Sequence, residues 1–302
     1  MVSEMDKVKI DHLKTESRNP KTLNLDAMST MELIRIMNEE DQRVIDTIKE
    51  ALPEIEKSIQ LVISALNQKG RLIYMGAGTS GRLGILDAVE CVPTFSTTDE
   101  VIGIIAGGNE AFVKAVEGAE DSEELAAKDL DKIHISENDV VVAIAASGRT
   151  PYAIGALKHA KKFKAKCISI TCNKDSKLAK YADAAIEVDA GPEVLTGSTR
   201  LKAGTCQKII LNMISTASMV GIGKVYGNLM IDMKATNLKL VERAKRIVME
   251  STGCDMDTAT KTLELTDYSC KTAIVMILTG VTKEEAVKRI VENRGFIRKC
   301  VD

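Results

Sequence analysis

The chain has 302 residues, of which 45% are hydrophobic and 28% charged, enough for one large domain or two modest ones with a real core. Forty-one basic residues against 43 acidic ones leave a net charge of −2, so no overall field would attract nucleic acid or an anionic membrane. Any anionic ligand must therefore be held by a local site.

The N-terminal stretch and the cysteines predict the cellular compartment. The first residues, MVSEMDKVKIDHLK, are charged and lack the apolar centre of a signal peptide, and no apolar run reaches membrane-spanning length. Seven cysteines without a CxxC pair are typical of buried, reduced thiols, and three histidines form no Cys/His cluster. We expect a cytoplasmic protein without a metal site.

In chain order, the first 28 residues are polar and irregular. Ser29 and Glu32 have the spacing of a capping box, which predicts the start of a helix. Pro53 predicts that this helix ends and a second one starts, and Lys69-Gly70 predicts the end of the second.

Five short, β-branched, apolar runs follow, and helical segments separate most of them. Continuous apolar strands that alternate with helices predict a parallel sheet covered on both faces, whose ligands bind in the loops after the strands. The predicted strands are 71–75, 101–106, 140–146, 167–172 and 184–190, and the predicted helices between them are 80–90, 109–132 and 151–163.

The last third of the chain has no strand pattern. Segment 205–220 is apolar nearly all round, which predicts a helix buried in the core or against a partner subunit. Beyond residue 235 the pattern predicts short helices at 237–250, 255–266, 269–279 and 282–294. The chain is thus divided into an N-terminal arm with helices (1–54), a ligand-binding domain (55–235) and a small helical subdomain (236–302).

The first strand-to-helix loop, residues 76–81, has the pattern GxGxxG, which also occurs in dinucleotide-binding folds. Those folds place an acidic residue after the next strand to hold a ribose hydroxyl, whereas here the nearest acid, Glu110, begins a helix. The hydroxyls of Thr79 and Ser80 beside free amides at a helix start favour a monophosphate over a dinucleotide.

Two further loops have the same character. In residues 146–151, Gly148 allows a tight turn, Ser147 and Thr150 carry hydroxyls, and Pro151 suits a first helical turn. The third loop is TGSTR at 196–200. Each alone could be a simple helix cap, but three of them on one parallel sheet predict a phosphate site.

Two acids are candidates for proton transfer. Glu90 lies among Ala88, Val89 and Cys91, and Glu120 lies in the acidic stretch EGAED. A carboxyl group among apolar neighbours has a raised pKa that suits general acid or base catalysis. Both positions also fit a solvated acid at a helix end, so the pattern alone does not decide their role.

At these segments the chain resembles the N-acetylmuramic acid 6-phosphate etherases, members of the sugar-isomerase (SIS) superfamily. The similar segments include GRLIYMGAGTSGRLGILDAVECVPTF, AVEGAED, IAASGRTPY and EVLTGSTRLKAGTCQKIILNMIST, and the resemblance covers essentially the whole chain. It implies an α/β fold of SIS type, a three-layer sandwich with a central parallel sheet flanked by helices, plus a small C-terminal helical subdomain.

The resemblance also implies the chemistry. The family converts N-acetylmuramic acid 6-phosphate and water into N-acetylglucosamine 6-phosphate and D-lactate, without metal or cofactor. It implies a homodimer whose only other partner is the small sugar phosphate, with no nucleic acid and no membrane. It assigns catalysis to Glu90, as proton donor, and Glu120, as base. The implied substrate or phosphate ligands are Gly78, Thr79, Ser80, Ser147, Gly148, Thr150, Glu193 and Ser198.

Two other functions fit the same fold. A non-catalytic sugar-phosphate sensor would resemble the glucokinase regulatory proteins, which are longer and carry duplicated SIS domains. An aldose–ketose isomerase would share the abstraction of the C2 proton but needs no acid directed at a leaving lactate. The presence of both acids favours the etherase, although the sequence does not decide which acid serves as base.

Overall fold

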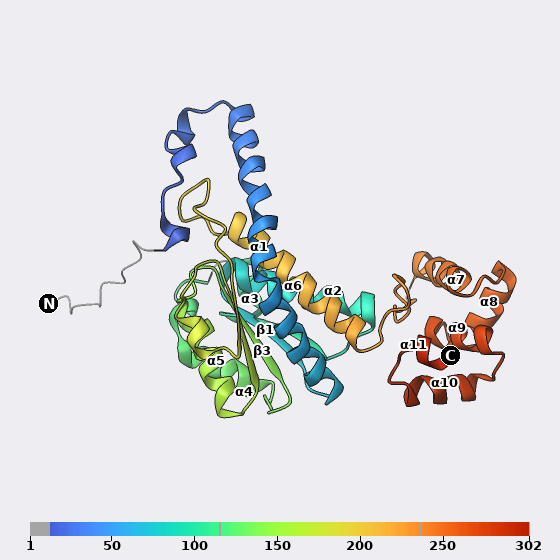
Figure 1. Cartoon of the computed structure of the whole chain (residues 1–302). Coiled ribbons are helices and arrows are strands. Elements are labelled where there is room, and N and C mark those ends of the chain that lie inside the picture. The colour runs from blue at the N-terminus through green and yellow to red at the C-terminus, as the bar shows by residue number, and fades with distance from the viewer. Residues whose placement is uncertain (1–12, 115, 236, 302) are drawn as a thin grey trace.

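A computed structural model describes residues 13–114, 116–235 and 237–301 (Figure 1). Its centre is a sheet of five parallel strands in the order β2-β1-β3-β4-β5. The strands are β1 (Leu72–Gly76), β2 (Val101–Ile105), β3 (Val140–Ala145), β4 (Lys166–Thr171) and β5 (Ala184–Glu187). Every residue of β1 and β3 is buried, as their continuous apolar sequences predict, and the predicted parallel sheet is confirmed.

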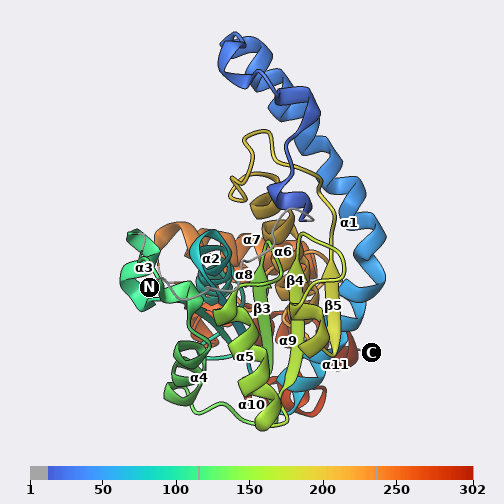
Figure 2. The ribbon, with the colours of Figure 1, turned by 90° about the vertical axis from the view of Figure 1, so that its left-hand side faces the viewer.

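Helices cover both faces of the sheet and make a three-layer sandwich, as predicted. One face packs against α1 (Thr30–Asn67), α2 (Gly78–Phe95) and α6 (Lys202–Gly221). The other packs against α4 (Glu123–Lys132) and α5 (Pro151–Lys162), which Figure 2 shows in front of the strands. Side chains alternate along each strand, so each face has its own apolar cluster.

The predicted break at Pro53 is wrong, because α1 is one continuous helix of 38 residues. Its predicted capping box is present, with both the Ser29 and the Glu32 side chains bonded. The buried side chains Val44, Ile48, Ile55 and Val62 continue across the proline and pack on the sheet. This packing holds the helix together despite the missing amide donor. The predicted division between residues 54 and 55 therefore falls inside a helix.

The single helix predicted over 109–132 is also wrong. The segment forms α3 (Gly108–Val113), a 3-10 turn η4 (Ala119–Asp121) and α4, whose first turn is capped by Ser122. Gly118, with φ +74°, interrupts helical geometry just before η4. As a result Glu120 lies in a short turn and not on a long helix.

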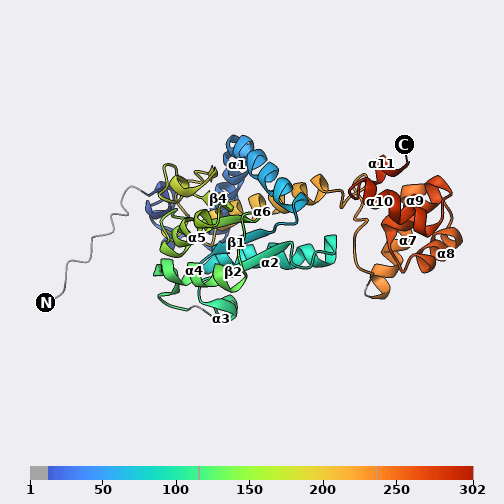
Figure 3. The same ribbon diagram turned by 90° about the horizontal axis from the view of Figure 1, so that it is seen from below.

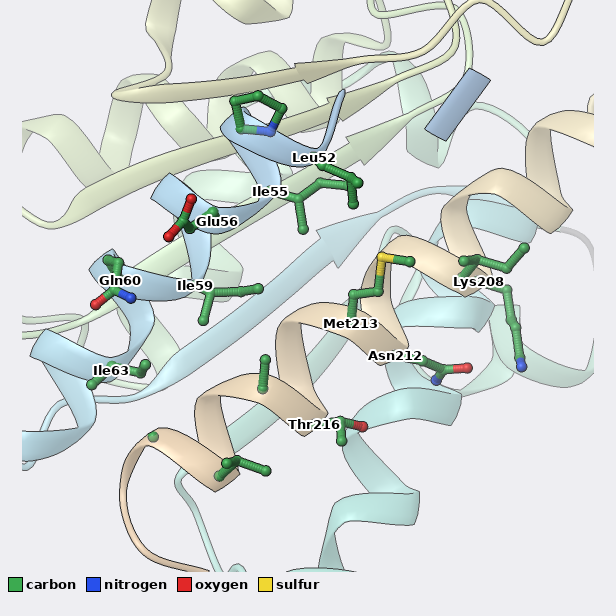
Figure 4. Close-up of a pocket in the computed structure, with 15 residues that line it drawn as sticks. Leu52, Ile55, Glu56, Ile59, Gln60, Ile63, Lys208, Asn212, Met213 and Thr216 are labelled. Carbon is green, nitrogen blue, oxygen red and sulfur yellow. The ribbon is translucent and has the colours of Figure 1, made fainter. Parts of the chain in front are cut away.

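Helix α6 begins at Lys202 and, within this chain, is buried on one side only, so the core covers only part of the helix that was predicted to be buried in the core or against a partner subunit. Cys206, Ile210 and Ile214 are fully buried, whereas Lys208 and Val220 are exposed. Between α6 and α1 lies an open, mostly apolar groove of about 1080 Å³ (Figure 4).

The N-terminal arm is held by hydrogen bonds to loops at the carboxyl edge of the sheet. The arm contains three 3-10 turns, η1 (Lys14–Glu16), η2 (Pro20–Thr22) and η3 (Leu25–Ala27). The Lys14 amide donates to Asn173 Oδ1 at 2.8 Å, and Thr22 Oγ1 donates to the Val194 carbonyl at 2.8 Å.

A buried ion pair joins the arm, α1 and α6. Lys202 Nζ lies 2.6 Å from Glu40 Oε2, and both side chains are 1% exposed. Lys21 Nζ lies 3.0 Å from the other Glu40 oxygen. Burial raises the pKa of Glu40, but hydrogen bonds from Lys202 and Lys21 outweigh it and hold the pKa at about 2.

The C-terminal helices form a group with its own apolar cluster, to one side of the sandwich (Figures 1 and 3). Lys224 and Lys271 both bind Asp232 in the preceding segment, at 3.2 and 2.9 Å. The predicted helical region is confirmed as α7 (Leu238–Thr252), α8 (Met256–Leu265), α9 (Cys270–Thr279), α10 (Lys283–Glu292) and α11 (Ile297–Val301), and the remaining element is η5 (Leu178–Tyr181). Within the described ranges, no helix combines the length and apolarity needed to cross a membrane.

Replacing Lys202 with Met should lower the free energy of unfolding by about 3–5 kcal/mol, because it leaves the Glu40 carboxylate buried with weaker compensation. Urea unfolding measures this, and Lys57→Met, at a half-exposed position on α1, is the matched control with an expected change below about 0.5 kcal/mol.

The pH dependence of the same pair has a definite sign. Because the pKa of Glu40 is lowered by folding, its stabilisation is present above the ordinary value of 4.5 and is lost as the pH falls toward 2. Equal stabilities of Lys202→Met and Lys57→Met at neutral pH would contradict this role of the pair.

Candidate functional site

The candidate site lies at the carboxyl edge of the sheet, between β1 and β3. These strands are neighbours, yet the chain continues from β1 through α2 to β2 on one side and from β3 through α5 to β4 on the other. Because α2 and α5 cover opposite faces, the loops after the two strands diverge and leave a crevice. The predicted loops 76–81 and 146–151 therefore meet at one place.

Glycines shape the first loop. A Cβ atom on Gly76 would lie 2.9 Å from the Gly81 nitrogen and from the Ile144 carbonyl oxygen, so only glycine allows this close approach. Helix α2 starts directly afterwards, and its N-cap residue Ala77 provides no side-chain hydrogen bond. The first amides of α2 are thus without a side-chain cap from that residue and suit an anion.

The second loop turns at Gly148, whose φ is +67° and whose missing Cβ would lie 2.4 Å from the Ser176 Cβ. The turn presents Ser147, whose Oγ accepts a hydrogen bond from the Arg149 amide at 3.3 Å. Thr150 precedes the first turn of α5 without making a side-chain cap. Two hydroxyls therefore lie at the crevice beside a second helix start.

The two loops enclose a cavity of about 430 Å³. The predicted site residues that line this cavity are Gly78, Thr79, Ser80, Ser147, Thr150 and Glu120. A smaller cavity of about 160 Å³ adjoins it and shares Ala77, Gly78 and Glu120. Glu120 therefore borders both spaces.

Some residues of the cavity were not predicted from sequence. Arg149 lies within the predicted second loop, and Thr199 within the third, so the loops themselves were the signal. Asp121 follows Glu120. Glu16 comes from the N-terminal arm, far away in sequence, and its place depends on the arm folding back over the sheet.

Contacts between helices hold this arrangement in place. Ser80 Oγ, which is buried, donates to Gln207 Oε1 of α6 at 2.9 Å. The Arg82 guanidinium donates to the Ala111 carbonyl at 2.8 Å and fastens α3 to α2. Ser80 thus links the first turn of α2 to α6, and it also borders the cavity.

Glu193 and Ser198 are not among the residues that line the cavity. Glu193 is buried and accepts hydrogen bonds from the Lys202 and Ala203 amides, both at 3.0 Å, so it caps the start of α6. Burial raises the pKa of Glu193, and the two amide hydrogen bonds oppose that rise. Ser198 is half-buried and directly precedes Thr199, which does line the cavity.

Glu90 lies away from the cavity. It is exposed on α2, and the helix rise of 1.5 Å per residue carries it about 18 Å beyond Gly78. Residues 78–80 at the start of the same helix line the cavity, but Glu90 does not. One chain therefore places Glu120, and not Glu90, beside the predicted phosphate loops.

The described part of the chain contains no group of three or more His, Cys, Asp or Glu side chains placed to hold a metal ion.

Fold and loops define an SIS domain. The family model for the glucokinase regulatory protein N-terminal SIS domain matches residues 54–161, and that for the SIS domain matches residues 113–217. A phosphoheptose isomerase from Francisella tularensis has a similar fold, with a TM-score of 0.50 at 18% identity over 64% of this chain and 98% of that chain.

Relatives that match nearly the whole chain show to which family within the SIS superfamily it belongs. The N-acetylmuramic acid 6-phosphate etherase of Geobacillus sp. (strain WCH70) is 58% identical over 97% of this chain and 99% of its own length. That of Bacillus mycoides (strain KBAB4) is 56% identical over 97% of this chain and 100% of its own length. The chain belongs to the N-acetylmuramic acid 6-phosphate etherase family.

Because Glu193 caps the start of α6, we predict that its substitution lowers the stability of the fold and affects binding only as a consequence. Glu193→Ala removes the acceptor of two amides at the start of α6 and should lower the free energy of unfolding by about 1–3 kcal/mol. Glu39→Ala, at an exposed position on α1, should change it by less than about 0.5 kcal/mol. Unchanged stability of Glu193→Ala together with weaker sugar-phosphate binding would instead make Glu193 a direct ligand.

Proposed function

We propose that the chain cleaves the D-lactyl ether of N-acetylmuramic acid 6-phosphate, giving N-acetylglucosamine 6-phosphate and D-lactate. The main support for this proposal is that Glu120 and two Ser/Thr-rich helix starts line the same cavity. The names of relatives at 55–58% identity over 97% of the chain support the same reaction.

In this proposal the 6-phosphate binds between the first two loops. The hydroxyls of Thr79, Ser147 and Thr150 and the first amides of α2 and α5 donate to its oxygens. The phosphate is remote from the bonds that react, so its binding energy serves to orient C2 and C3 of the sugar. In this proposal Gly148 shapes the second loop without contacting the phosphate. Ser198 and Glu193 support the third loop.

Glu120 is proposed as the general base. The C2 proton is acidic only in the ring-opened sugar, where C2 lies next to the aldehyde. The Glu120 carboxylate takes this proton, and the electron pair of the C2–H bond forms an enolate. The enolate then expels the ether oxygen from C3, which leaves an α,β-unsaturated aldehyde.

Glu90 is proposed as the acid that protonates the departing lactate oxygen, which keeps the electron pair of the broken C3–O bond. Water then adds at C3 of the unsaturated aldehyde, and C2 regains a proton. Every step is a proton transfer or an addition–elimination, so two carboxyl groups and an anchored phosphate supply the chemistry.

We further propose that the protein works in the cytoplasm as a homodimer, in the breakdown and recycling of amino sugars from cell walls. Seven unpaired cysteines, six of them buried, are typical of a reducing compartment. The open apolar groove beside α6 provides a surface for a second copy.

The sensor and isomerase alternatives are less well supported. The glucokinase regulatory protein model matches residues 54–161 and describes an SIS domain, whereas the etherase relatives match 97% of the chain. An isomerase would need no proton donor for a leaving lactate.

Substitution of the two acids should separate two steps. Glu90→Gln should stop D-lactate release, while exchange of the C2 hydrogen of N-acetylglucosamine 6-phosphate with deuterated water continues. Glu120→Gln should abolish both, because the base is lost. Each loss should be about 100-fold to 10,000-fold, the usual effect of a missing general acid or base. Proton NMR of the C2 signal and a lactate assay measure the two steps.

Glu124→Gln, at an exposed position on α4 close to Glu120 in sequence, is the matched control and should behave as wild type. Exchange that survives in Glu120→Gln but not in Glu90→Gln would reverse the two roles. Near-normal lactate release by both variants would remove these acids from the mechanism.

A further inference from the structure

A side cavity of about 160 Å³ adjoins the larger cavity at Glu120. Its walls are the start of α2 and the segment that runs from the end of β2 through α3 to η4. Helix α3 packs against α2 and β2 at the edge of the sheet (Figure 3). Because Glu120 borders both cavities, a sugar whose C2 lies at Glu120 can extend a neighbouring substituent into the side cavity.

Glycines bring the walls of the side cavity together. A Cβ atom on Gly107, whose φ is +89°, would lie 3.0 Å from the Val116 Cβ and 3.2 Å from the Ala111 Cβ, so glycine allows the segment to fold back closely on itself. Gly118, with φ +74°, then turns the chain into η4. The side chains of Ala106, Ala111 and Val116 give this wall a small, apolar lining that suits a methyl group.

Arg82 is the one cation among the described residues that line the side cavity. It follows Gly78 by one helical turn and lies on the same side of α2. Its Nε donates to the Phe112 carbonyl at 3.0 Å, and its Nη2 donates to the Ala111 carbonyl at 2.8 Å. These carbonyls belong to the last turn of α3, and they hold the guanidinium in place before any ligand binds.

The charge of Arg82 has no acidic partner in the described part of the chain. Its guanidinium forms no ion pair with residues 13–114, 116–235 or 237–301, and its Nη1 makes no hydrogen bond with them. Glu117 and Glu120 also line the side cavity, but both are exposed, so water screens their charges. The N–H donors that α3 does not use therefore suit a carboxylate ligand.

Two groups near C2 of N-acetylmuramic acid 6-phosphate can enter the side cavity, the acetamido group on C2 and the D-lactyl group on C3. Size does not separate them, because 160 Å³ is the share of about five water molecules and has room for either group. Charge does separate them. The lactyl group ends in a carboxylate and carries a methyl group, which match the guanidinium and the apolar wall, whereas the acetamido group is neutral.

We propose that Arg82 binds the carboxylate of the D-lactyl group in the side cavity and so selects substrates that carry this group. The inference rests on the proposed function, in which Glu120 removes the C2 proton. Arg82 holds the leaving group on C3 while the base acts on C2, which keeps the C3–O bond aligned for expulsion by the enolate. Arg82 transfers no proton itself, and N-acetylglucosamine 6-phosphate, which lacks the lactyl group, binds without it.

A substrate analogue in which the lactyl carboxylate is an amide tests this proposal. The wild-type protein should cleave the amide with a kcat/KM about 10-fold to 100-fold lower than the acid, because hydrogen bonds to a charged oxygen are lost. Arg82→Gln should be slow on the acid and should lack most of this preference. Both substrates give N-acetylglucosamine 6-phosphate, whose formation is followed by proton NMR. The amide alters the leaving group equally for both proteins, so the difference between their preferences is decisive.

The product separates recognition of the lactyl group from a merely structural role of Arg82. N-acetylglucosamine 6-phosphate has no lactyl group, so Arg82→Gln should bind it with wild-type affinity in calorimetry and exchange its C2 hydrogen at the wild-type rate. If Arg82 only fastened α3 to α2, its loss would displace Glu120 and slow this exchange. Lys114→Gln, at an exposed position directly after α3 and outside the side cavity, is the matched control and should keep the wild-type preference for the acid.

Equal cleavage of acid and amide by the wild type, or a wild-type preference for the acid in Arg82→Gln, would overturn the proposal. Weaker binding of N-acetylglucosamine 6-phosphate by the variant, with that preference unchanged, would assign the side cavity to the acetamido group instead. If Arg82→Gln does not fold, Arg82→Lys takes its place. Lysine keeps the charge without the planar set of donors, so its preference should be intermediate, and a wild-type preference there would again overturn the proposal. A wild-type protein that releases no lactate from the acid would instead overturn the proposed function.

Discussion

The pairing of β1 with β3 is the constraint on which the site depends. Both strands run in the same direction, and their register pairs Gly76 with Ile144. The loops after the two strands therefore leave the sheet at the same level. The helices that follow cover opposite faces, and the crevice between them is a consequence of this topology. Gly76 allows the close approach of the two loops, because a Cβ atom there would collide with the Ile144 carbonyl and the Gly81 amide.

A second constraint joins the site to the rest of the chain. The arm, α1 and α6 meet at Glu40 and Lys202, a buried pair that is costly unless it is complete. The same region contains Glu193, which caps α6 just after the third loop. Parts of the chain that are far apart in sequence thus fix the borders of one cavity, with Glu16 on one side and Thr199 on another.

The sequence predicts well whatever depends on local pattern. The five strands and the two Gly–Ser/Thr loops that meet at the cavity were predictable because apolar, β-branched runs and Gly–Ser/Thr turns have local causes; that these loops bind a phosphate stays a prediction. The break that Pro53 predicts is absent because the buried stripe of α1 continues across it, and Gly118 breaks the helix predicted over 109–132 because it adopts a positive φ. The distance of Glu90 from the cavity was not predictable, because it depends on where α2 points once the sheet is assembled.

In the proposed reaction, lactate leaves by elimination at C3, followed by addition of water. The most direct test is to incubate the purified protein with N-acetylmuramic acid 6-phosphate in water labelled with heavy oxygen, and to analyse both products by mass spectrometry and NMR. The account predicts unlabelled D-lactate and a labelled C3 hydroxyl on N-acetylglucosamine 6-phosphate, since the C3–O bond breaks. Label in the lactate, or no lactate at all, would contradict it.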